Sequence, residues 1–166
     1  MRYIIIAVLS IVFIFLERPE YLSGKSFLTS ATYHFFHANI FHLAANCLSV
    51  WYLFKKTITR NNKTMIAEIL IAYIIATFSY MVAFRPIIGV SNMLFAIIGM
   101  RTPAWSSSWW HAKETRLFFG ITLFMLVFPQ VSAITHITAF IIGVIVSMTK
   151  RKIKSLENDY RRATYK

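Results

Sequence analysis

The sequence predicts an all-α membrane protein, a bundle of six transmembrane helices. Three observations support this fold class: an apolar composition, six separate apolar runs, and basic residues gathered in alternate links between those runs. Of the 166 residues, 57% are hydrophobic and only 14% are charged. A typical soluble domain has about 25% charged residues and about 45–50% apolar ones. A soluble fold of this length could not bury so much apolar surface, so we expect a lipid bilayer around it.

The six apolar runs are the expected helices. They lie at Tyr3–Leu16, Phe36–Phe54, Met65–Phe84, Ile87–Met100, Leu117–Phe128 and Ser132–Met148. Three of them are shorter than the roughly 20 residues that cross a bilayer core, which a span surrounded by other helices or reaching a water-filled cavity tolerates. The first run resembles the apolar region of a signal peptide, but Glu17-Arg18-Pro19-Glu20 follows it instead of a small-residue cleavage site. We therefore interpret it as an uncleaved first span.

The basic residues predict the orientation of these spans. They gather in the link between spans 2 and 3, in the link between spans 4 and 5, and in the tail from Lys150, whereas the other three links are nearly neutral. Cytoplasmic loops of membrane proteins are enriched in lysine and arginine. The pattern predicts an even number of crossings with both termini in the cytoplasm, and we expect a prokaryotic cell (inner) membrane. The net charge of +12 is not gathered on one face or domain, so nucleic-acid binding is not predicted.

The domain organisation follows from the same pattern. We expect one membrane domain over residues 1–149 and a basic cytoplasmic tail over residues 150–166, either a short helix or disordered. The tail could touch anionic lipid, but its simpler interpretation is an orientation signal. The one cysteine, Cys47, lies in an apolar run and is interpreted as a small buried hydrophobic residue, so no intrachain disulfide is possible.

Polar residues inside the expected spans are the candidates for function, because such groups are costly in lipid. Span 2 opens with His34, His37, His42 and Asn46, span 4 contains Ser91 and Asn92, and span 6 contains Thr135 and His136. All three spans enter from the outer side under the predicted topology. At a rise of 1.5 Å per residue, His42, Ser91 and His136 then lie roughly 6–8 Å below the outer surface. The sequence therefore predicts one layer of polar side chains from three helices.

The residue types in this layer suggest nucleophilic catalysis. A serine hydroxyl is a weak nucleophile unless a base takes its proton, and histidine suits that task near neutral pH. His42, Asn46 and the backbone N–H of Ser91 could donate hydrogen bonds to a tetrahedral oxyanion. No acid lies in the outer half of a span, and Glu68 starts span 3 at the cytoplasmic end. Any catalysis should therefore use a Ser-His dyad rather than a triad.

Each of these residues also has a non-catalytic interpretation. Serine and asparagine in membrane helices commonly serve packing and helix–helix hydrogen bonding. Histidines from several helices can ligate haem or a metal, but no H-E-x-x-H or other acid partner is present, so we predict neither metal nor cofactor. His34 and His37 lie near the interface, where a histidine costs little.

Taken together, these residues resemble the rhomboid family of intramembrane serine proteases, from span 2 to span 6. His37-Ala-Asn-Ile-Phe-His42-Leu-Ala-Ala-Asn46 is similar to the family pattern H-x-x-x-x-H-x-x-x-N, and Gly89-Val90-Ser91-Asn92 resembles G-x-S-G. Thr135-His136, followed by Gly143, resembles the A-H-x-x-G-x-x-x-G motif of the last core helix. Three motifs in order, on the expected spans and at matched depth, are a specific signal.

The resemblance implies a role for each matched residue. Ser91 would be the nucleophile and His136 the base, with His42 and Asn46 at the oxyanion hole. Phe95, one turn beyond Ser91, resembles the aromatic residue that stacks on the catalytic histidine, although an ordinary core aromatic is equally compatible. His37 matches a position with a structural role. Substrates would be single-span membrane proteins cut near the outer face, at a small residue in a locally unstable helix.

Three departures from the family pattern bear on activity. Asn92 replaces the glycine after the serine, where its side chain could crowd the oxyanion hole or add a donor to it. Ala139 replaces the first glycine of the last motif, and the family's Trp-Arg pair is not found between spans 1 and 2. The sequence thus predicts a rhomboid-like serine protease. A non-catalytic rhomboid-like chaperone or binding protein is the alternative, and a histidine-ligated cofactor or transport protein is a third hypothesis.

Overall fold

The computed structural model describes residues 2–16, 26–55, 62–83, 87–102 and 133–164, together with the single positions 116 and 120. Every regular element in these ranges is helical, as predicted. The elements are α1 (Arg2–Phe15), α2 (Phe27–Thr32), the 3-10 helix η2 (Tyr33–Phe35), α3 (Ile40–Lys55), α4 (Asn62–Met81), α5 (Ser91–Arg101) and α7 (Ala133–Thr164). The predicted span at Leu117–Phe128 lies outside the described residues, apart from position 120, as do residues 17–25 of the link between spans 1 and 2.

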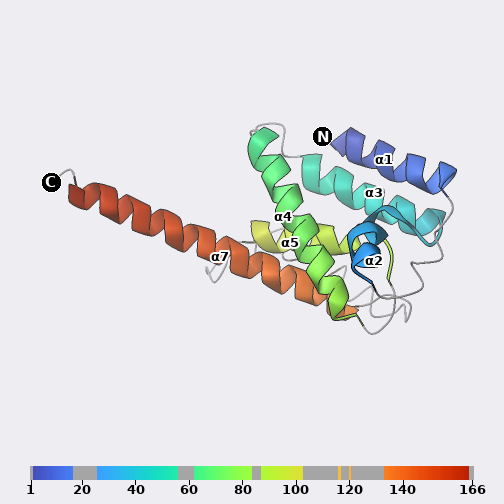
Figure 1. Cartoon of the computed structure of the whole chain (residues 1–166). Coiled ribbons are helices and arrows are strands. Elements are labelled where there is room, and N and C mark those ends of the chain that lie inside the picture. Colours follow the sequence, from blue (N-terminus) through green and yellow to red (C-terminus); the bar gives the residue numbers. More distant parts are fainter. Residues whose placement is uncertain are drawn as a thin grey trace.

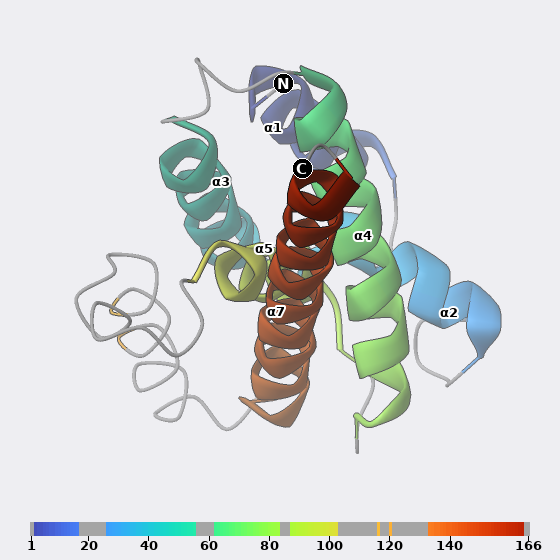
Figure 2. The ribbon, with the colours of Figure 1, turned by 90° about the vertical axis from the view of Figure 1, so that its left-hand side faces the viewer.

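Helix α5 is the centre of the bundle. It packs against α7, α4 and α3, while α1 covers the far side of α3 (Figures 1 and 2). Its apolar residues are buried nearly all round: Leu94, Phe95, Ala96, Ile97 and Ile98. A helix that is hydrophobic on all sides belongs in an interior. With protein rather than lipid around it, α5 can be only 11 residues long, as the short fourth run suggested.

Small residues allow α5 and α7 to approach closely. A Cβ added to Gly99 would overlap the carbonyl oxygen of Phe140, and one added to Gly143 would overlap the carbonyl oxygen of Ala96. Small residues at the crossing point are the usual device for close packing of membrane helices. Ala139 is fully buried at this interface, so its methyl group fits where the family pattern has a glycine.

Two helices begin later than the apolar runs predicted. Helix α3 begins at Ile40 rather than near Phe36, because the Asn39 side chain accepts a hydrogen bond from the His42 N–H at 2.9 Å and caps the helix there. Helix α5 begins at Ser91 rather than near Ile87, because Gly89 has φ of +106°, which a right-handed helix cannot contain. His34 and His37 therefore precede the membrane helix, and Ser91 is the first residue of α5 instead of lying one turn inside it.

The long apolar helices fit a bilayer. Within the described residues, Lys63–Met81 and Ala133–Thr164 are long and apolar enough to cross a membrane, and Arg2–Phe15 and Ile40–Phe54 are shorter apolar helices. The predicted count of six crossings extends into residues that are not described and stays a prediction. So does the domain division at residue 149, where α7 runs on without interruption to Thr164.

Candidate active site

Ser91 and His136 lie in direct contact at the N-terminal ends of α5 and α7. The Ser91 Oγ and the His136 Nε2 are 2.8 Å apart, a hydrogen-bond distance, although 45 positions separate the two residues. Both are buried, with 8% of Ser91 and 4% of His136 exposed. For the serine to donate, Nε2 must be unprotonated and the ring proton must sit on Nδ1. That arrangement is the one a base needs to receive the hydroxyl proton.

Phe95 fixes the plane of the His136 ring. The two rings stack with centroids 4.5 Å apart and an interplanar angle of 24°. Phe95 can do this because residues i and i+4 share one face of a helix, so Ser91 and Phe95 both point toward α7. The Nδ1 of His136 is buried and has no hydrogen-bond partner among the described residues. Ring stacking, rather than a carboxylate, orients this histidine in the part of the chain that the structure describes.

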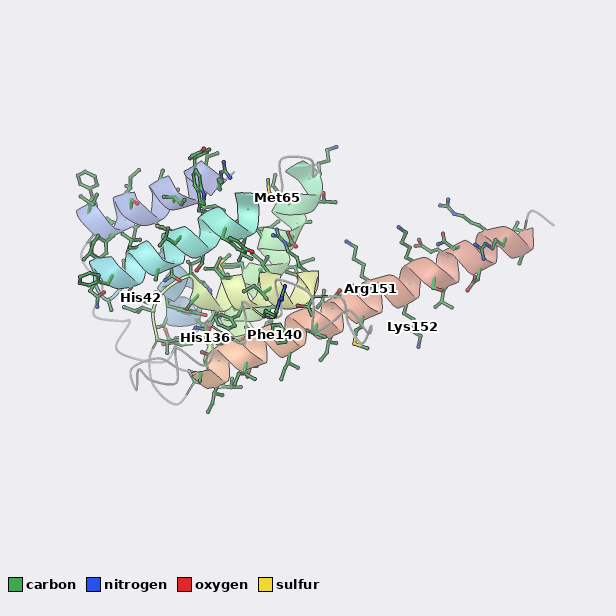
Figure 3. All side chains as sticks on the ribbon, turned by 180° about the vertical axis from the view of Figure 1, so that it is seen from behind. His42, Met65, His136, Phe140, Arg151 and Lys152 are labelled. Atoms are coloured by element: carbon green, nitrogen blue, oxygen red, sulfur yellow. The ribbon has the colours of Figure 1, made fainter. Side chains whose placement is uncertain are left out.

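His42 presents a donor to the same site. Its Nδ1 accepts a hydrogen bond from the backbone N–H of Ala38 at 3.4 Å, so the neutral ring carries its proton on Nε2. That Nε2 faces Gly89, since a Cβ built on Gly89 would lie 2.8 Å from it. The loop before α3 therefore selects the tautomer that can donate toward the segment carrying Ser91. Figure 3 shows His42 and His136 at the same end of the bundle, opposite Met65.

Asn46 lies one turn further along α3 and adds a second donor. Its side chain is buried, and its Nδ2 has no hydrogen-bond partner in the described part of the chain. The Nδ2 would lie 3.2 Å from a Cβ on Gly89. A buried N–H without a partner costs free energy unless something binds to it. Gly89 is thus required twice, for its positive φ and for the room that its missing side chain leaves beside His42 and Asn46.

The beginning of α5 supplies backbone donors. The first N–H groups of a helix have no acceptor within the helix, and the helix dipole makes this end positive. Val90 occupies the capping position and makes no side-chain cap. The N–H of Ser91 therefore lies at a positive helix end, next to the Ser91 hydroxyl, where an anion is favoured.

Asn92 points away from this cluster. Its Nδ2 donates to the hydroxyl of Tyr33 at 2.9 Å, and that hydroxyl in turn donates to the carbonyl oxygen of Ala76 on α4 at 3.1 Å. Consecutive helix residues are about 100° apart around the axis, so Asn92 faces α4 and η2 while Ser91 faces α7. The amide is thus directed toward Tyr33 and away from Ser91. This contact gives Asn92 a structural role, and its effect on an oxyanion stays a prediction.

Tyr33 is a site-supporting residue that the sequence did not reveal. Besides bonding Asn92 and Ala76, it accepts a hydrogen bond from the Gly89 N–H through its carbonyl oxygen at 3.0 Å. Burial raises the pKa of the Tyr33 phenol, which keeps it protonated as a donor. Tyr33 thus holds both sides of the Gly89–Asn92 turn. One local signal pointed to this region: Ser26 is a good N-cap residue, and its Oγ accepts a hydrogen bond from the Thr29 N–H at the start of α2, the short helix that precedes Tyr33.

The remaining histidines lie beside the site, outside the dyad. His37 stacks edge-on against His42 with centroids 5.1 Å apart, which supports the structural role expected for it. His34 is buried against Tyr33 and Tyr73, and its Nε2 lies 3.3 Å from the Thr77 hydroxyl. Burial lowers the pKa of His34 to about 3, so this ring is neutral at pH 7. Within the described ranges, no group of three His, Cys, Asp or Glu residues could hold a metal ion.

The Asn92–Tyr33 bond leads to a first prediction. We expect Asn92→Ala to lower the free energy of unfolding by about 1–3 kcal/mol, because a buried hydrogen-bonded pair is broken. We also expect the Ser91 hydroxyl to keep its reactivity, measured as the labelling rate by a fluorophosphonate. Thermal unfolding in detergent gives the first quantity. A large gain in labelling in Asn92→Ala would instead show that the amide obstructs the site.

The helices and this cluster together describe a helical membrane protein with a buried serine–histidine pair. Comparison with protein-family models matches residues 24–153 to the Rhomboid domain. The match covers more than half of the chain, so the protein belongs to the rhomboid family, which includes intramembrane serine proteases, and it is an integral membrane protein. Comparisons with curated proteins and with solved structures find no match.

Proposed function

We propose that this protein is an intramembrane serine protease that hydrolyses peptide bonds in or near transmembrane segments of other membrane proteins. The observation that carries the proposal is the 2.8 Å contact between the Ser91 Oγ and the His136 Nε2. Nucleophile and base within hydrogen-bond reach are the geometric signature of covalent catalysis by serine. The tautomer of His42 and the partnerless Nδ2 of Asn46 add support, because both give donors beside the nucleophile.

The geometry suggests the following steps. The Ser91 Oγ attacks the scissile carbonyl while the His136 Nε2 takes its proton. The oxyanion of the tetrahedral intermediate accepts hydrogen bonds from the His42 Nε2–H, the Asn46 Nδ2–H and the Ser91 N–H. His136 then gives the proton to the leaving amine, and the acyl group stays on Ser91. Water, activated by the same histidine, releases the acyl group and restores the serine.

The position of the site in the bundle determines how a substrate would reach it. In the proposed topology of six crossings with both termini in the cytoplasm of a prokaryotic cell, the dyad lies just below the outer surface, where water can enter. A backbone in a helix is shielded by its own hydrogen bonds, so a substrate must unwind locally. Single-span proteins with a small residue at the cleavage point fit these requirements. Each step uses side chains and backbone of this chain and water.

A fluorophosphonate probe tests the proposal directly, because it reacts only with an activated serine. The purified protein in detergent should label at Ser91, and Ser91→Ala and His136→Ala should each lose labelling by about a hundredfold or more. Ser49, whose hydroxyl donates to the carbonyl oxygen of Ala45 within α3, is the matched control: Ser49→Ala should label like the unmodified protein. Labelling that survives in Ser91→Ala would exclude the proposed nucleophile, and no labelling of any form would favour the non-catalytic chaperone.

A further inference from the structure

The end of α7 extends well beyond the rest of the bundle. The helix has 32 residues, so at 1.5 Å per residue it is about 48 Å long, against a bilayer core of about 30 Å. If Ala133 lies at the outer surface, the core ends near Lys152. The residues that follow form the extension seen in Figures 1 and 3, where Arg151 and Lys152 mark its beginning. Every side chain from Met148 to Thr164 is exposed.

This extension has an apolar stripe with the spacing of a coiled coil. The stripe consists of Thr149, Ile153, Leu156, Tyr160 and Ala163, at alternating steps of four and three residues. Steps of three and four place residues on one side of a helix, at the a and d positions of a heptad. The large side chains of the stripe are exposed: 53% of Ile153, 59% of Leu156 and 73% of Tyr160. No described residue of the same chain covers them.

The charges around the stripe are arranged for a second, parallel helix. Counting Ile153 as position a, Lys152 lies at g and Glu157 at the following e. In a parallel pair, g of one helix faces the next e of its partner, so Lys152 of each chain would meet Glu157 of the other. Four other basic residues occupy the outer positions b, c and f: Arg151, Lys154, Arg161 and Arg162. Lys150 lies at e of the preceding heptad, where the facing g position of a partner holds the uncharged Ile145. The Lys152–Glu157 pair thus places opposite charges beside the apolar stripe, and most of the other basic residues point away from it.

The same pattern argues against the membrane surface as the partner. A helix lying on anionic lipid needs its basic residues beside the apolar stripe, at the level of the headgroups. Here four of the six basic residues of the extension lie away from the stripe, whereas Lys150 and Lys152 lie next to it together with both acids, Glu157 and Asp159. Laid on lipid by its apolar side, the helix would turn most of its positive charge to the cytoplasm.

We propose that the extension of α7 is a homodimerisation element, in which Ile153, Leu156 and Tyr160 pack against the same residues of a second copy as a short parallel coiled coil. Two copies in one bilayer share their orientation, so only the parallel arrangement is available to them. The membrane also holds both extensions in one layer, which raises their effective concentration and lets two heptads suffice. This proposal does not depend on catalysis by Ser91.

Cysteine cross-linking in the full-length protein tests the face of contact. In a Cys47→Ser background, Leu156→Cys places a thiol on the stripe, and Asn158→Cys places one on the opposite side two residues away. In vesicles of zwitterionic lipid at low protein content, we expect the disulfide-linked dimer of Leu156→Cys to exceed that of Asn158→Cys by about tenfold. Equal cross-linking at both positions, or none at Leu156, would overturn the proposal.

A charge exchange tests the register. Lys152→Glu alone and Glu157→Lys alone each place like charges across the interface, so the cross-linked fraction should fall by about threefold or more. The double variant restores opposite charges and should recover the original fraction. If the double variant stays low, the parallel pairing is wrong. If Leu156 cross-links less once anionic lipid is added, the extension binds the membrane surface instead of a second copy.

Discussion

His136→Ala is expected to slow the cleavage of a single-span model substrate by about 10⁴-fold, the upper range for loss of a general base. Without the imidazole, the Ser91 hydroxyl keeps its proton, and no other described side chain that could take it lies within hydrogen-bond distance of the Oγ. The rate is measured in detergent or vesicles with a substrate whose fragments separate by size. Most of the loss should appear in kcat, because the base acts after the substrate is bound.

Two comparisons distinguish loss of chemistry from loss of structure. Ile137→Ala changes the neighbouring residue on α7, which is partly exposed and points away from α5, and should stay within about twofold of the unmodified rate. Ser91→Ala should match His136→Ala, and the double variant should be no slower than either, because the two residues act as one unit. A double variant whose losses multiply would contradict the dyad. So would a His136→Ala protein that keeps a tenth of the rate.

Glu68→Gln is expected to destabilise the protein by about 3–5 kcal/mol, the largest stability effect that the structure suggests. The Glu68 carboxylate accepts two hydrogen bonds from Arg101, at 2.9 Å from Nε and 2.8 Å from Nη2. The side chains are only 8% and 13% exposed for Glu68 and Arg101, respectively. Arg101 also donates to the carbonyl oxygen of Leu53, so the pair ties together the ends of α3, α4 and α5 that lie farthest from Ser91. The substitution leaves the guanidinium buried without its counter-ion.

The double variant Glu68→Met/Arg101→Met gives the matched control. Removing both charges of a buried pair costs far less than removing one, and is often neutral. Thermal or detergent-induced unfolding should therefore rank the double variant well above Glu68→Gln. The reverse order would show that the ion pair itself, rather than the stranded charge, accounts for the stability. The fluorophosphonate labelling of folded Glu68→Gln should be unchanged, since the pair lies at the opposite end of α5 from Ser91.

Much of the site was predictable because its residues carry local signals. Gly89 and Ser91 stand two positions apart, and His42 and Asn46 one helical turn apart, so motif and helix period place each pair without knowledge of the fold. The family match over residues 24–153 confirms the resemblance that these motifs indicated. The catalytic roles themselves stay a proposal that the labelling and cleavage experiments decide.

Other features depended on contacts that no local pattern encodes. Tyr33 and Asn92 are 59 positions apart, and their hydrogen bond directs the Asn92 amide away from Ser91. The starts of α3 and α5 were predicted too early because hydrophobicity continues through Phe36 and Ile87, whereas the helices begin where Asn39 caps one and Gly89 interrupts the other. Apolar composition predicts which segments lie in lipid or in the protein core, but it does not predict the residue at which a helix begins.

Composition and hydrophobic periodicity alone predicted a helical protein that belongs in a membrane, because burial of apolar groups depends on composition summed over each run. The sequence also indicated that Ser91 and His136 lie in separate apolar runs, with no acid beside them. The contact between these two residues depends on how the helices pack, which the sequence pattern does not encode. The Ser91–His136 contact requires α5 and α7 to cross closely enough at Gly99 and Gly143, and that approach is set by the packing of whole helices.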